Sequence, residues 1–342
     1  MKLLIYLPAL NEEVNIGQVI AGLPRSLSGV DCVEVLVVDD GSTDCTREKA
    51  LACGAAVLSH GRNRGVGAAL RSAVQYGLEN SADVLVGMDA DGQFDAKDIP
   101  QLIEPILHDR ADMVMGSRFG DGRPANMPRM KFWGNSWVAD LLGFISGRRF
   151  RDVSCGFRAY GRAALLRLNL FGDFTYTHET ILSLHFQGLR VVEQPVGVTY
   201  YATRKSRVAG SLYSYAVQTS KIMFRVMLDY RPMRVFGGLA GLLCAVGLAF
   251  VLYMLGHYLL TGAFTPYKSF GFIGLGFVIF GALVFLIALV ADMLNRLRRN
   301  QDSILLELRQ IHYQTTAARS GQPDSYREST PVSGEPTTKH LP

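Results

Sequence analysis

The chain has few cysteines, and none of them is placed as a metal site or a disulfide framework would require. Five cysteines occur in 342 residues, their number is odd, and no Cys-x-x-Cys pair is present. This pattern argues against a cysteine-rich zinc site and favours a reducing compartment. The amino-terminal apolar run is too short for a signal peptide, because Asn11, Glu12 and Glu13 follow it at once. We interpret this run as a first strand and expect the amino-terminal domain to be cytoplasmic.

Charge is missing from two long stretches. Residues 235–260 and 270–291 contain no Asp, Glu, Lys or Arg, although 19% of the whole chain is charged. As helices these stretches would be roughly 39 and 33 Å long, and each could cross a hydrocarbon core of about 30 Å. Two buried helices of a globular core are a poor alternative at these lengths. The composition therefore excludes a disordered chain and a purely soluble protein.

The basic residues around these two stretches predict their orientation. Arginines precede the first stretch and follow the second, whereas the connection 261–269 holds only Lys268. By the positive-inside rule, both flanks are cytoplasmic and the connection lies outside. We therefore expect a multi-pass protein of the cell membrane with both termini in the cytoplasm. The flanking arginines are Arg225, Arg231, Arg234, Arg296, Arg298 and Arg299.

Two common nucleotide-binding fingerprints are also missing. The glycine-containing run that begins at Asn63 and Arg64 has no Gly-Lys-Ser/Thr after it, so it is not a Walker A loop. It also does not follow the first predicted strand, where a Gly-x-Gly-x-x-Gly dinucleotide fingerprint belongs. Kinase and dehydrogenase functions are therefore disfavoured, and the run is either a phosphate contact or a plain turn before a helix.

The pattern from residue 1 to about 120 predicts a doubly wound α/β domain. Apolar runs, polar turns and helical stretches alternate, as in a parallel sheet covered by helices. Strands are predicted at 3–7, 34–38, 56–59, 84–88 and 113–116, and helices at 14–23, 43–53, 66–76 and 99–107. Ligands of such sheets bind at the carboxyl ends of the strands. Residues 121–200, with a predicted helix at 132–145 and a strand at 191–196, complete the same domain.

The rest of the chain is predicted to serve the membrane. The catalytic domain is assigned to residues 1–207 and an interfacial amphipathic helix to 208–232. Two transmembrane helices, at about 235–260 and 270–291, occupy residues 233–292. A cytoplasmic helix is assigned to 293–319, and a disordered tail rich in Ser, Thr, Pro and Gly to 320–342.

Two acidic residues follow the fourth predicted strand. Asp89 and Asp91 are two apart in an extended segment, so their side chains can point the same way. Together they suit a hard divalent cation that also binds a diphosphate, whose departure such a cation assists. A plain Asp-Gly turn is the alternative for this pair.

A second acidic pair follows the second predicted strand. Asp39 or Asp40 can accept hydrogen bonds from ribose hydroxyls or base nitrogens, and Ser42 or Thr43 can cap the next helix. Helix capping does not account for two adjacent carboxylates, which repel each other unless a positive or hydrogen-bonding group approaches them.

Basic residues accumulate where the chain approaches the membrane. Each could be a solvated charge or a contact with anionic lipid. Beside a metal-binding pair, however, they suggest a second substrate that carries a phosphate and is embedded in the lipid. These residues are Arg118, Arg123, Arg129, Lys131, Lys205 and Arg207.

Six motifs in this order resemble glycosyltransferase family 2, and within it the polyprenyl-phosphate sugar synthases of the dolichyl-phosphate mannosyltransferase type. The resemblance covers residues 3–207 and the membrane anchor. The motifs are Leu7-Pro8-Ala9-Leu10-Asn11-Glu12-Glu13, Val38-Asp39-Asp40-Gly41-Ser42-Thr43-Asp44, Asn63-Arg64-Gly65, Asp89-Ala90-Asp91-Gly92-Gln93, Gly116-Ser117-Arg118-Phe119, and Asp152 with Cys155-Gly156-Phe157-Arg158-Ala159.

The resemblance implies a GT-A fold that transfers one sugar, with inversion, from a nucleotide diphosphate to an undecaprenyl or dolichyl phosphate. It implies a metal ion, Mg²⁺ or Mn²⁺, held by Asp89, Asp91 and Gln93. It makes Asp89, Asp91, Asp152 and Glu179 the catalytic residues, with Asp152 and Glu179 near the sugar. The nucleotide pocket would be formed by Pro8, Ala9, Asn11, Glu12, Asp39 and Asp40. The phosphate and acceptor contacts would be Arg118, Arg129, Lys131, Lys205 and Arg207.

The expected chemistry needs no catalytic histidine. A phosphate monoester is mostly dianionic at neutral pH and can attack the anomeric carbon without a general base. His60 and His178 are therefore predicted to be structural or positioning groups. Attack opposite the departing diphosphate gives a β-linked product from an α-linked donor.

Several alternatives stay open at this stage. A processive polysaccharide synthase would carry a Gln-x-x-Arg-Trp motif, which we do not find, and an inactive scaffold would bind partners through residues 301–342. The run 204–207 departs from the mannosyl-type pattern, which favours a UDP-sugar over GDP-mannose. No nucleic acid partner is expected. A homo-oligomer is compatible with the small residues of the apolar stretches, which are Gly237, Gly241, Gly274 and Gly281.

Overall fold

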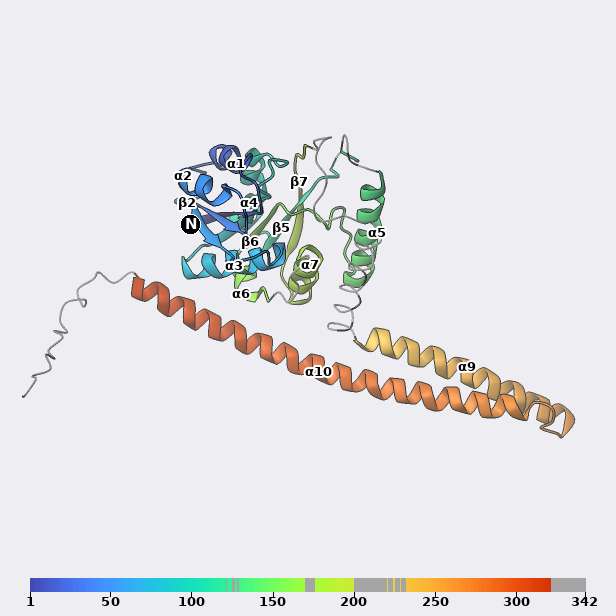
Figure 1. Ribbon diagram of the computed structural model, residues 1–342. Coiled ribbons are helices and arrows are strands. Elements are labelled where there is room, and N and C mark those ends of the chain that lie inside the picture. The colour runs from blue at the N-terminus through green and yellow to red at the C-terminus, as the bar shows by residue number, and fades with distance from the viewer. Residues whose placement is uncertain are drawn as a thin grey trace, which may run out of the picture.

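The computed structural model describes most of the chain. The described residues are 1–120, 122–124, 127, 129–169, 176–199, 220, 224, 228 and 232–320. Their arrangement is an α/β domain joined to two very long helices (Figure 1). The predicted interfacial helix at 208–232 falls almost wholly outside the described residues, and so does the tail beyond residue 320.

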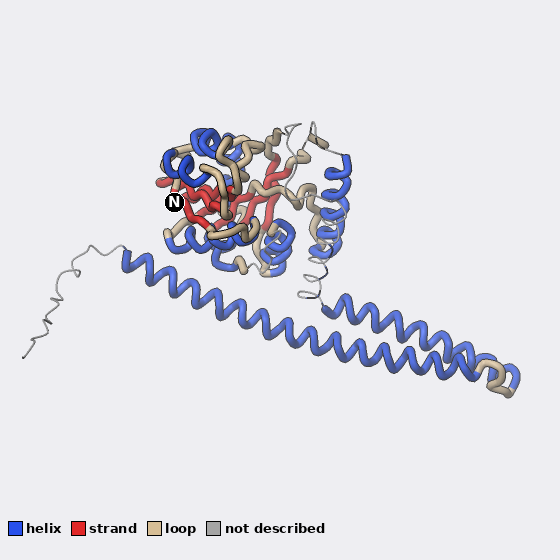
Figure 2. The backbone as a smooth tube through the Cα atoms, viewed as in Figure 1, coloured by secondary structure: helices blue, strands red, loops and turns tan. Residues whose placement is uncertain are grey.

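The domain is built on a seven-stranded sheet with the order β3-β2-β1-β4-β6-β5-β7. Figure 2 shows the strands of this sheet in red, with blue helices on either side. The five predicted strands and the strand predicted at 191–196 are confirmed. The sheet is mixed, however, because the unpredicted β6 runs antiparallel to β4 and β5. The bounds are β1 Lys2–Ala9, β2 Cys32–Asp39, β3 Ala56–Ser59, β4 Val84–Gly87, β5 Met113–Ser117, β6 Arg158–Gly161 and β7 Val191–Pro195.

Helices cover both faces of the sheet, which confirms the predicted α/β class. On one face, α3, α5, α6 and α7 pack on side chains such as Leu4 and Leu36. On the other face, α1, α2 and α4 pack on Leu3 and Ile5. The alternation of Leu3, Leu4 and Ile5 between faces is the period of two of a strand buried on both sides. The bounds are α1 Ile16–Gly22, α2 Thr46–Ala52, α3 Val66–Glu79, α4 Ile99–Leu107, α5 Arg129–Ser146, α6 Arg162–Arg167 and α7 Thr177–Phe186.

The two apolar stretches form a helical hairpin. Helix α9 spans Pro232–Thr261 and helix α10 spans Lys268–Ser320, and both are long and apolar enough to cross a membrane. Most of their large apolar side chains are exposed, so they are not core helices of a soluble domain. Gly247 and Gly274 face each other, since a Cβ on Gly247 would lie 2.6 Å from the Gly274 carbonyl oxygen. The absent side chains allow this close approach of the two backbones.

The structure joins two elements that the sequence analysis had separated. The second apolar stretch and the predicted cytoplasmic helix are one continuous helix, α10, because nothing between residues 291 and 301 breaks the helical pattern. Gly274 and Gly281 pack against α9 within the chain, whereas a Cβ at Gly237 or Gly241 would meet nothing within 4 Å among the described residues.

Candidate active site

The carboxyl ends of three neighbouring strands bring the predicted nucleotide and metal residues to one edge of the sheet. Ala9, at the end of β1, is in register with Asp39 at the end of β2. On the other side of β1, Tyr6 is in register with Gly87, two residues before Asp89. Because parallel strands end at the same edge, residues that are 30 to 80 positions apart in the chain become neighbours there.

The loop after β4 carries the Asp89 and Asp91 pair. Both residues are partly exposed, and Asp91 Oδ1 accepts a hydrogen bond of 3.0 Å from the Gln93 amide. The Asp89 carboxylate lies against Gly156, where an added Cβ would be 3.1 Å from both carboxylate oxygens. The Gln93 carbonyl accepts a 2.9 Å bond from the Thr199 amide, which pins this loop to the segment that leads toward residues 204–207.

The donor set at this loop is incomplete for a metal on its own. Within the described part of the chain there is no group of three or more His, Cys, Asp or Glu that could hold an ion. Two carboxylates at the end of a strand do fit a hard cation that takes its other oxygen ligands from a diphosphate and water, as Mg²⁺ characteristically does. The residues present therefore fit an ion that binds together with a nucleotide.

The nucleotide candidates of β1 and β2 form an interlocked pair of loops. Asn11 has a left-handed φ of 52°, its amide donates to Ser42 Oγ at 2.9 Å, and its Oδ1 accepts from the Thr43 amide at 2.8 Å. The Glu12 amide donates to Thr46 Oγ1 at 2.8 Å. These bonds hold the two loops at a fixed separation beside the ends of β1 and β2.

The two adjacent aspartates have different partners. Asp39 is buried and accepts bonds from the Ser42 amide at 2.9 Å and from Ser59 Oγ at 3.1 Å. Asp40 is also buried, and it lies 2.7 Å from His60 Nδ1 while accepting bonds from the backbone amides that open the next helix. Those amides belong to Arg64, at 2.9 Å, and Gly65, at 2.8 Å.

The position of Asp40 changes the expectation for the acidic pair. The sequence predicted a nucleotide contact for it, yet three donors from the protein's own chain surround its carboxylate. The contacts that offset the repulsion between the two adjacent carboxylates are thus made by the 60–65 loop to Asp40. Gly41, with φ of +81°, makes this possible, since a Cβ there would lie 2.6 Å from the Arg62 carbonyl carbon.

Arg118 and Asp152 form a buried ion pair. Arg118 Nε donates to Asp152 Oδ2 at 2.6 Å, and Nη2 donates to Oδ1 at 2.9 Å and to Ser154 Oγ at 2.7 Å. The Asp152 side chain has no exposed surface and that of Arg118 is 7% exposed. Burial alone would raise the pKa of Asp152, but the charge and hydrogen bonds of Arg118 outweigh burial, so this pKa lies below its ordinary value.

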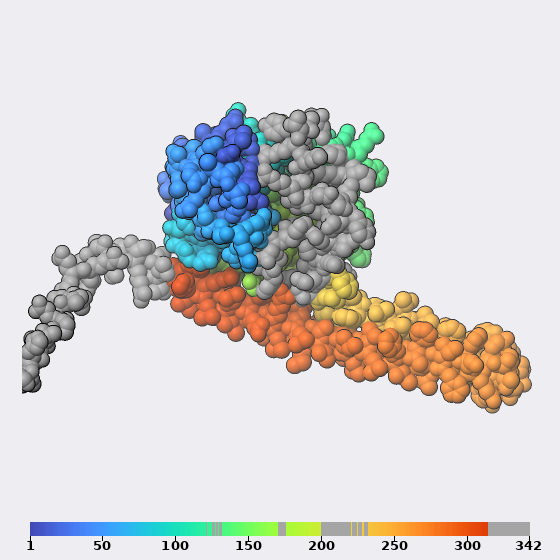
Figure 3. Space-filling view, in the orientation of Figure 1, coloured from blue at the N-terminus to red at the C-terminus, as the bar shows by residue number. Residues whose placement is uncertain are grey.

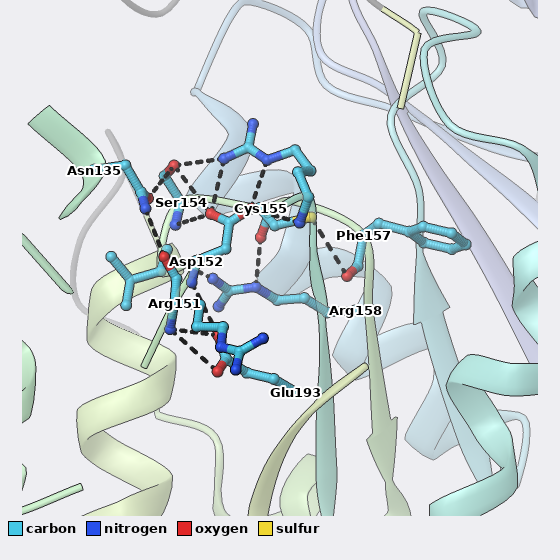
Figure 4. Close-up of polar contacts among 10 residues, drawn as sticks. Asn135, Arg151, Asp152, Ser154, Cys155, Phe157, Arg158 and Glu193 are labelled. Atoms are coloured by element: carbon cyan, nitrogen blue, oxygen red, sulfur yellow. Dashed lines mark hydrogen bonds and ion pairs between the residues drawn. The ribbon is translucent and has the colours of Figure 1, made fainter. Parts of the chain in front are cut away.

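The loop that carries Asp152 is held from several sides (Figure 4). Glu193 of β7 accepts the backbone amides of Arg151 and Asp152, both at 2.9 Å. Asn135 of α5 donates to the Arg151 carbonyl at 2.9 Å and accepts from Ser154 Oγ at 2.8 Å. The sequence gives no local signal for Glu193 or Asn135, because each acts on a loop far from it in the chain.

Arg158, which lies in the sixth sequence motif, is a buried brace between two segments of the domain. It has no exposed surface, and its guanidinium donates to the carbonyls of Cys155, Val153 and Thr177 and to Thr180 Oγ1, at 2.7 to 3.0 Å. Its charge is thus offset by oxygen dipoles. The brace ties the 151–157 loop to the first turn of α7. An arginine inside an otherwise apolar run was the available signal.

Comparison with known proteins places this arrangement in a family. The family model described as glycosyl transferase family 2 matches residues 4–168. The undecaprenyl-phosphate mannosyltransferase of Micrococcus luteus is 30% identical over 232 residues, which cover 64% of this chain and 91% of that protein. The chain belongs to glycosyltransferase family 2. It is therefore a glycosyltransferase enzyme, as its motifs predicted.

Two further similarities cover more of this glycosyltransferase. It is 29% identical over 310 residues to glycosyltransferase AglJ of Haloferax volcanii, and these residues cover 89% of this chain and 97% of AglJ. Its fold is similar to that of glucosyl-3-phosphoglycerate synthase from Mycobacterium tuberculosis, crystallised with Mn²⁺, UDP-glucose and phosphoglyceric acid. That match has a TM-score of 0.52 and 23% identity, and covers 65% of this chain and 79% of that one. It confirms the predicted GT-A fold.

The remaining predicted site residues of the glycosyltransferase lie in two places. Glu179 is partly exposed in the first turn of α7, next to the Arg158 brace. Arg129 is exposed at the start of α5. Lys131 belongs to α5 by its backbone, but its side chain, like the whole of Lys205 and Arg207, lies outside the described residues.

His178 of the glycosyltransferase is buried, and its Nε2 atom has no hydrogen-bond partner among the described residues. Burial, and then the charge of Arg158, lower the pKa of His178 to about 3, although Asp152 opposes this shift. The imidazole is therefore uncharged at pH 7.

This low pKa predicts how stability depends on pH. The unfolded chain takes up a proton on His178 as pH falls through about 6.5, whereas the folded protein does not until about pH 3. The free energy of unfolding therefore falls with pH in this window, and we expect His178 to contribute about 1.5 kcal/mol of loss between pH 6.5 and 5. Thermal unfolding in detergent should show a shallower pH dependence for His178→Asn. An unchanged dependence in that variant would contradict the assignment.

Proposed function

We propose that this glycosyltransferase transfers a single sugar from a nucleotide-diphosphate sugar to a polyprenyl phosphate at the cytoplasmic face of a membrane. One observation carries the proposal. The acidic pair Asp89 and Asp91 lies at the edge of a GT-A sheet, in the same chain as two helices long and apolar enough to cross a bilayer. An acceptor that is held in the membrane by its lipid explains why a nucleotide-sugar site and two membrane-spanning helices occur in one chain. The name of the Micrococcus luteus relative, an undecaprenyl-phosphate mannosyltransferase, supports this acceptor class.

On the donor side, the proposal assigns binding of the diphosphate to the loop after β4. Asp89 and Asp91 would hold a divalent cation with help from Gln93, and that ion, when bound, would neutralise the charge of the departing diphosphate. The interlocked loops of Asn11 and Asp39 would receive the base and ribose. The bonds that fix these loops before the substrate arrives reduce the entropy lost on binding.

On the acceptor side, we propose that Arg118 contacts a phosphate and that Asp152 positions the Arg118 guanidinium. Asp152 has no exposed surface, and each of its oxygens already accepts from Arg118. It therefore acts through the arginine, whose planar guanidinium it holds in one orientation. The partly exposed Glu179 is the better candidate for a sugar contact. A dianionic phosphate supplies its own nucleophile, so inversion at the anomeric carbon requires no general base.

Helix α5 supports a bilayer partner for the catalytic domain. Trp133, Trp137 and Phe144 lie on one face of α5, and they are 72%, 55% and 77% exposed. Aromatic residues of this kind are enriched where proteins meet the headgroup region, and basic residues favour anionic lipid. Exposed Arg148 and Arg149 follow the end of α5. In Figure 1, α5 is drawn at the same end of the domain as the start of α9.

This surface makes a prediction about fluorescence. Trp133 and Trp137 are the two tryptophans of the chain, so its emission reports on α5 alone. We expect a quencher attached near the headgroups of a reconstituted bilayer to reduce this emission strongly, and a water-soluble quencher to reduce it weakly. Single Trp→Phe variants would divide the signal between the two positions. Equal access of the soluble quencher with and without lipid would contradict the bilayer contact.

Two finer proposals concern the donor and the topology. The donor is a UDP-sugar, and both ends of the protein chain lie in the cytoplasm. The first proposal follows from the departure at 204–207, and the second from arginines such as Arg234 and Arg296 that flank the helical hairpin. A single transfer agrees with the described helices, of which only α9 and α10 are long and apolar enough to span. One hairpin does not enclose a channel for a growing polymer.

The decisive test is product analysis. The purified protein would be supplied with UDP-glucose, UDP-N-acetylglucosamine or GDP-mannose, together with undecaprenyl phosphate and Mg²⁺, Mn²⁺ or a chelator. We expect one donor to yield a lipid whose mass has increased by one hexose or N-acetylhexosamine, and only with metal. A polymeric product would support a processive synthase. No lipid product from any donor, with binding of nucleotide also absent, would support an inactive scaffold.

A further inference from the structure

Helix α10 continues far beyond the apolar hairpin and lies against the catalytic domain. It contacts α3 and α6, and Figure 3 shows its red end against the lower surface of the domain. The uncharged stretch of α10 ends at Ala291, and about 27 Å of helix separate that position from Arg309. The far end of this helix therefore lies beyond the apolar hairpin and packs on the catalytic domain.

The contact is made by one face of α10. Arg309 Nη1 donates to the carbonyls of Leu166 and Leu168, each at 2.9 Å. Leu306 and Tyr313, one turn to either side of Arg309, pack on the hydrophobic cluster beneath α3 and α6. Residues three and four apart share a helix face, so these three side chains form one docking surface.

Arg309 donates hydrogen bonds to carbonyl groups at the carboxyl-terminal end of α6. This helix ends at Arg167, and the carbonyls of its last turn have no partner within the helix. They also carry the negative end of the helix dipole, which a guanidinium stabilises. Arg309 thus caps α6 from a position more than 140 residues away in the chain.

The capped end of α6 precedes the part of the site that α7 carries. Leu168 is followed, across residues outside the described ranges, by α7 with Glu179, and Arg158 ties the Thr177 carbonyl of α7 to the loop of Asp152. The membrane hairpin is therefore linked to the active-site edge by α10 through α6, in addition to the connection that enters α9.

We propose that Arg309, with Leu306 and Tyr313, is a positioning residue that fixes the height of the active-site edge above the bilayer. This inference rests on the proposed function, because it concerns an acceptor phosphate held at the membrane surface. A soluble substrate reaches the site at any height of the domain. A lipid-linked phosphate reaches it only if α10 holds the domain at the depth of the headgroups.

The test measures transfer by Arg309→Ala to two acceptors, together with the KM for the nucleotide sugar. The acceptors are undecaprenyl phosphate in vesicles and a short-chain, water-soluble prenyl phosphate. We expect the KM for undecaprenyl phosphate to rise about tenfold, the change that losing charge-assisted hydrogen bonds to two carbonyls implies. The kcat and KM for the short acceptor, and the KM for the nucleotide sugar, should stay within twofold of wild type. Arg309→Lys should restore part of the loss, and Gln310→Ala, on the exposed face of the same turn, should have no effect.

The two acceptors separate the possible failures. Transfer to neither acceptor by the wild-type protein would defeat the proposed function itself. An equal loss on both acceptors in Arg309→Ala would mean that the contact only stabilises the domain, which would overturn the positioning role. No change on either acceptor would overturn it as well. The activity on the short acceptor also reports that the variant is folded.

Discussion

Asp91→Ala is expected to lower kcat/KM for sugar transfer by about 10³-fold or more while the protein stays folded. A metal ion at a departing diphosphate contributes several kcal/mol to the transition state, and each 1.4 kcal/mol corresponds to a factor of ten. Asp91 is partly exposed in a loop, so its removal takes little from the core. We expect the free energy of unfolding to change by less than about 1 kcal/mol. Steady-state transfer with and without Mn²⁺, beside thermal unfolding, measures both quantities.

The control for this experiment comes from the same loop. Asp95 is four residues further on and exposed, and its carboxylate caps a short 3-10 helix at Ala96–Asp98 by accepting from the Lys97 amide. Asp95→Asn keeps an acceptor at that position and should transfer sugar normally, whereas Asp91→Asn should resemble Asp91→Ala. Metal-dependent turnover that survives Asp91→Ala would show that the cation, if used, is held elsewhere.

Asp152→Asn is expected to destabilise the catalytic domain by about 3 to 5 kcal/mol, because it leaves the buried Arg118 without its carboxylate. Both oxygens of Asp152 accept from Arg118, and the loop around them is held by Glu193 and Asn135. For a domain of this size the loss corresponds to a drop in Tm of order 10 °C. At temperatures below the unfolding transition, transfer activity should also be lower than that of the wild type, since the guanidinium of Arg118 loses its fixed orientation.

A second aspartate–arginine pair provides the matched control. Asp109 is paired with Arg190 at 2.6 Å, but its side chain is 92% exposed. Exposed pairs of this kind contribute at most about 1 kcal/mol, so Asp109→Asn should leave Tm and activity close to wild type. Equal unfolding temperatures for Asp152→Asn and the wild type would contradict the structural importance of the buried pair.

Much of the fold could be predicted because its signals are local. The apolar runs that became β1, β2 and β4 are continuous, which is typical of strands buried on both faces. The absence of charge in 235–260 and 270–291 identified the helical hairpin without any knowledge of its surroundings. Strand ends also located Asp39 and Asp89 at one edge, since in a parallel sheet that edge is common to all strands.

The features that the sequence did not predict depend instead on contacts between distant parts of the chain. Strand β6 begins with the buried Arg158 and ends with Gly161, so its four residues do not form the continuous apolar run that identified β3 and β4. Its antiparallel insertion between β4 and β5 is a matter of which edges meet in space. Likewise, one continuous α10 was divided in two because its composition changes at the membrane boundary, although its backbone pattern does not.

The sequence by itself determined the α/β class, the glycosyltransferase motifs and the two apolar helices, because each is written in residues that lie close together in the chain. Only the tertiary structure decided what the charged side chains do. Asp40 accepts hydrogen bonds from the 60–65 loop, 24 residues away, and Asp152 pairs with Arg118, 34 residues away. Arg309 binds the end of α6, more than 140 residues away. A buried charge must find a partner wherever packing brings one, and packing depends on the whole chain.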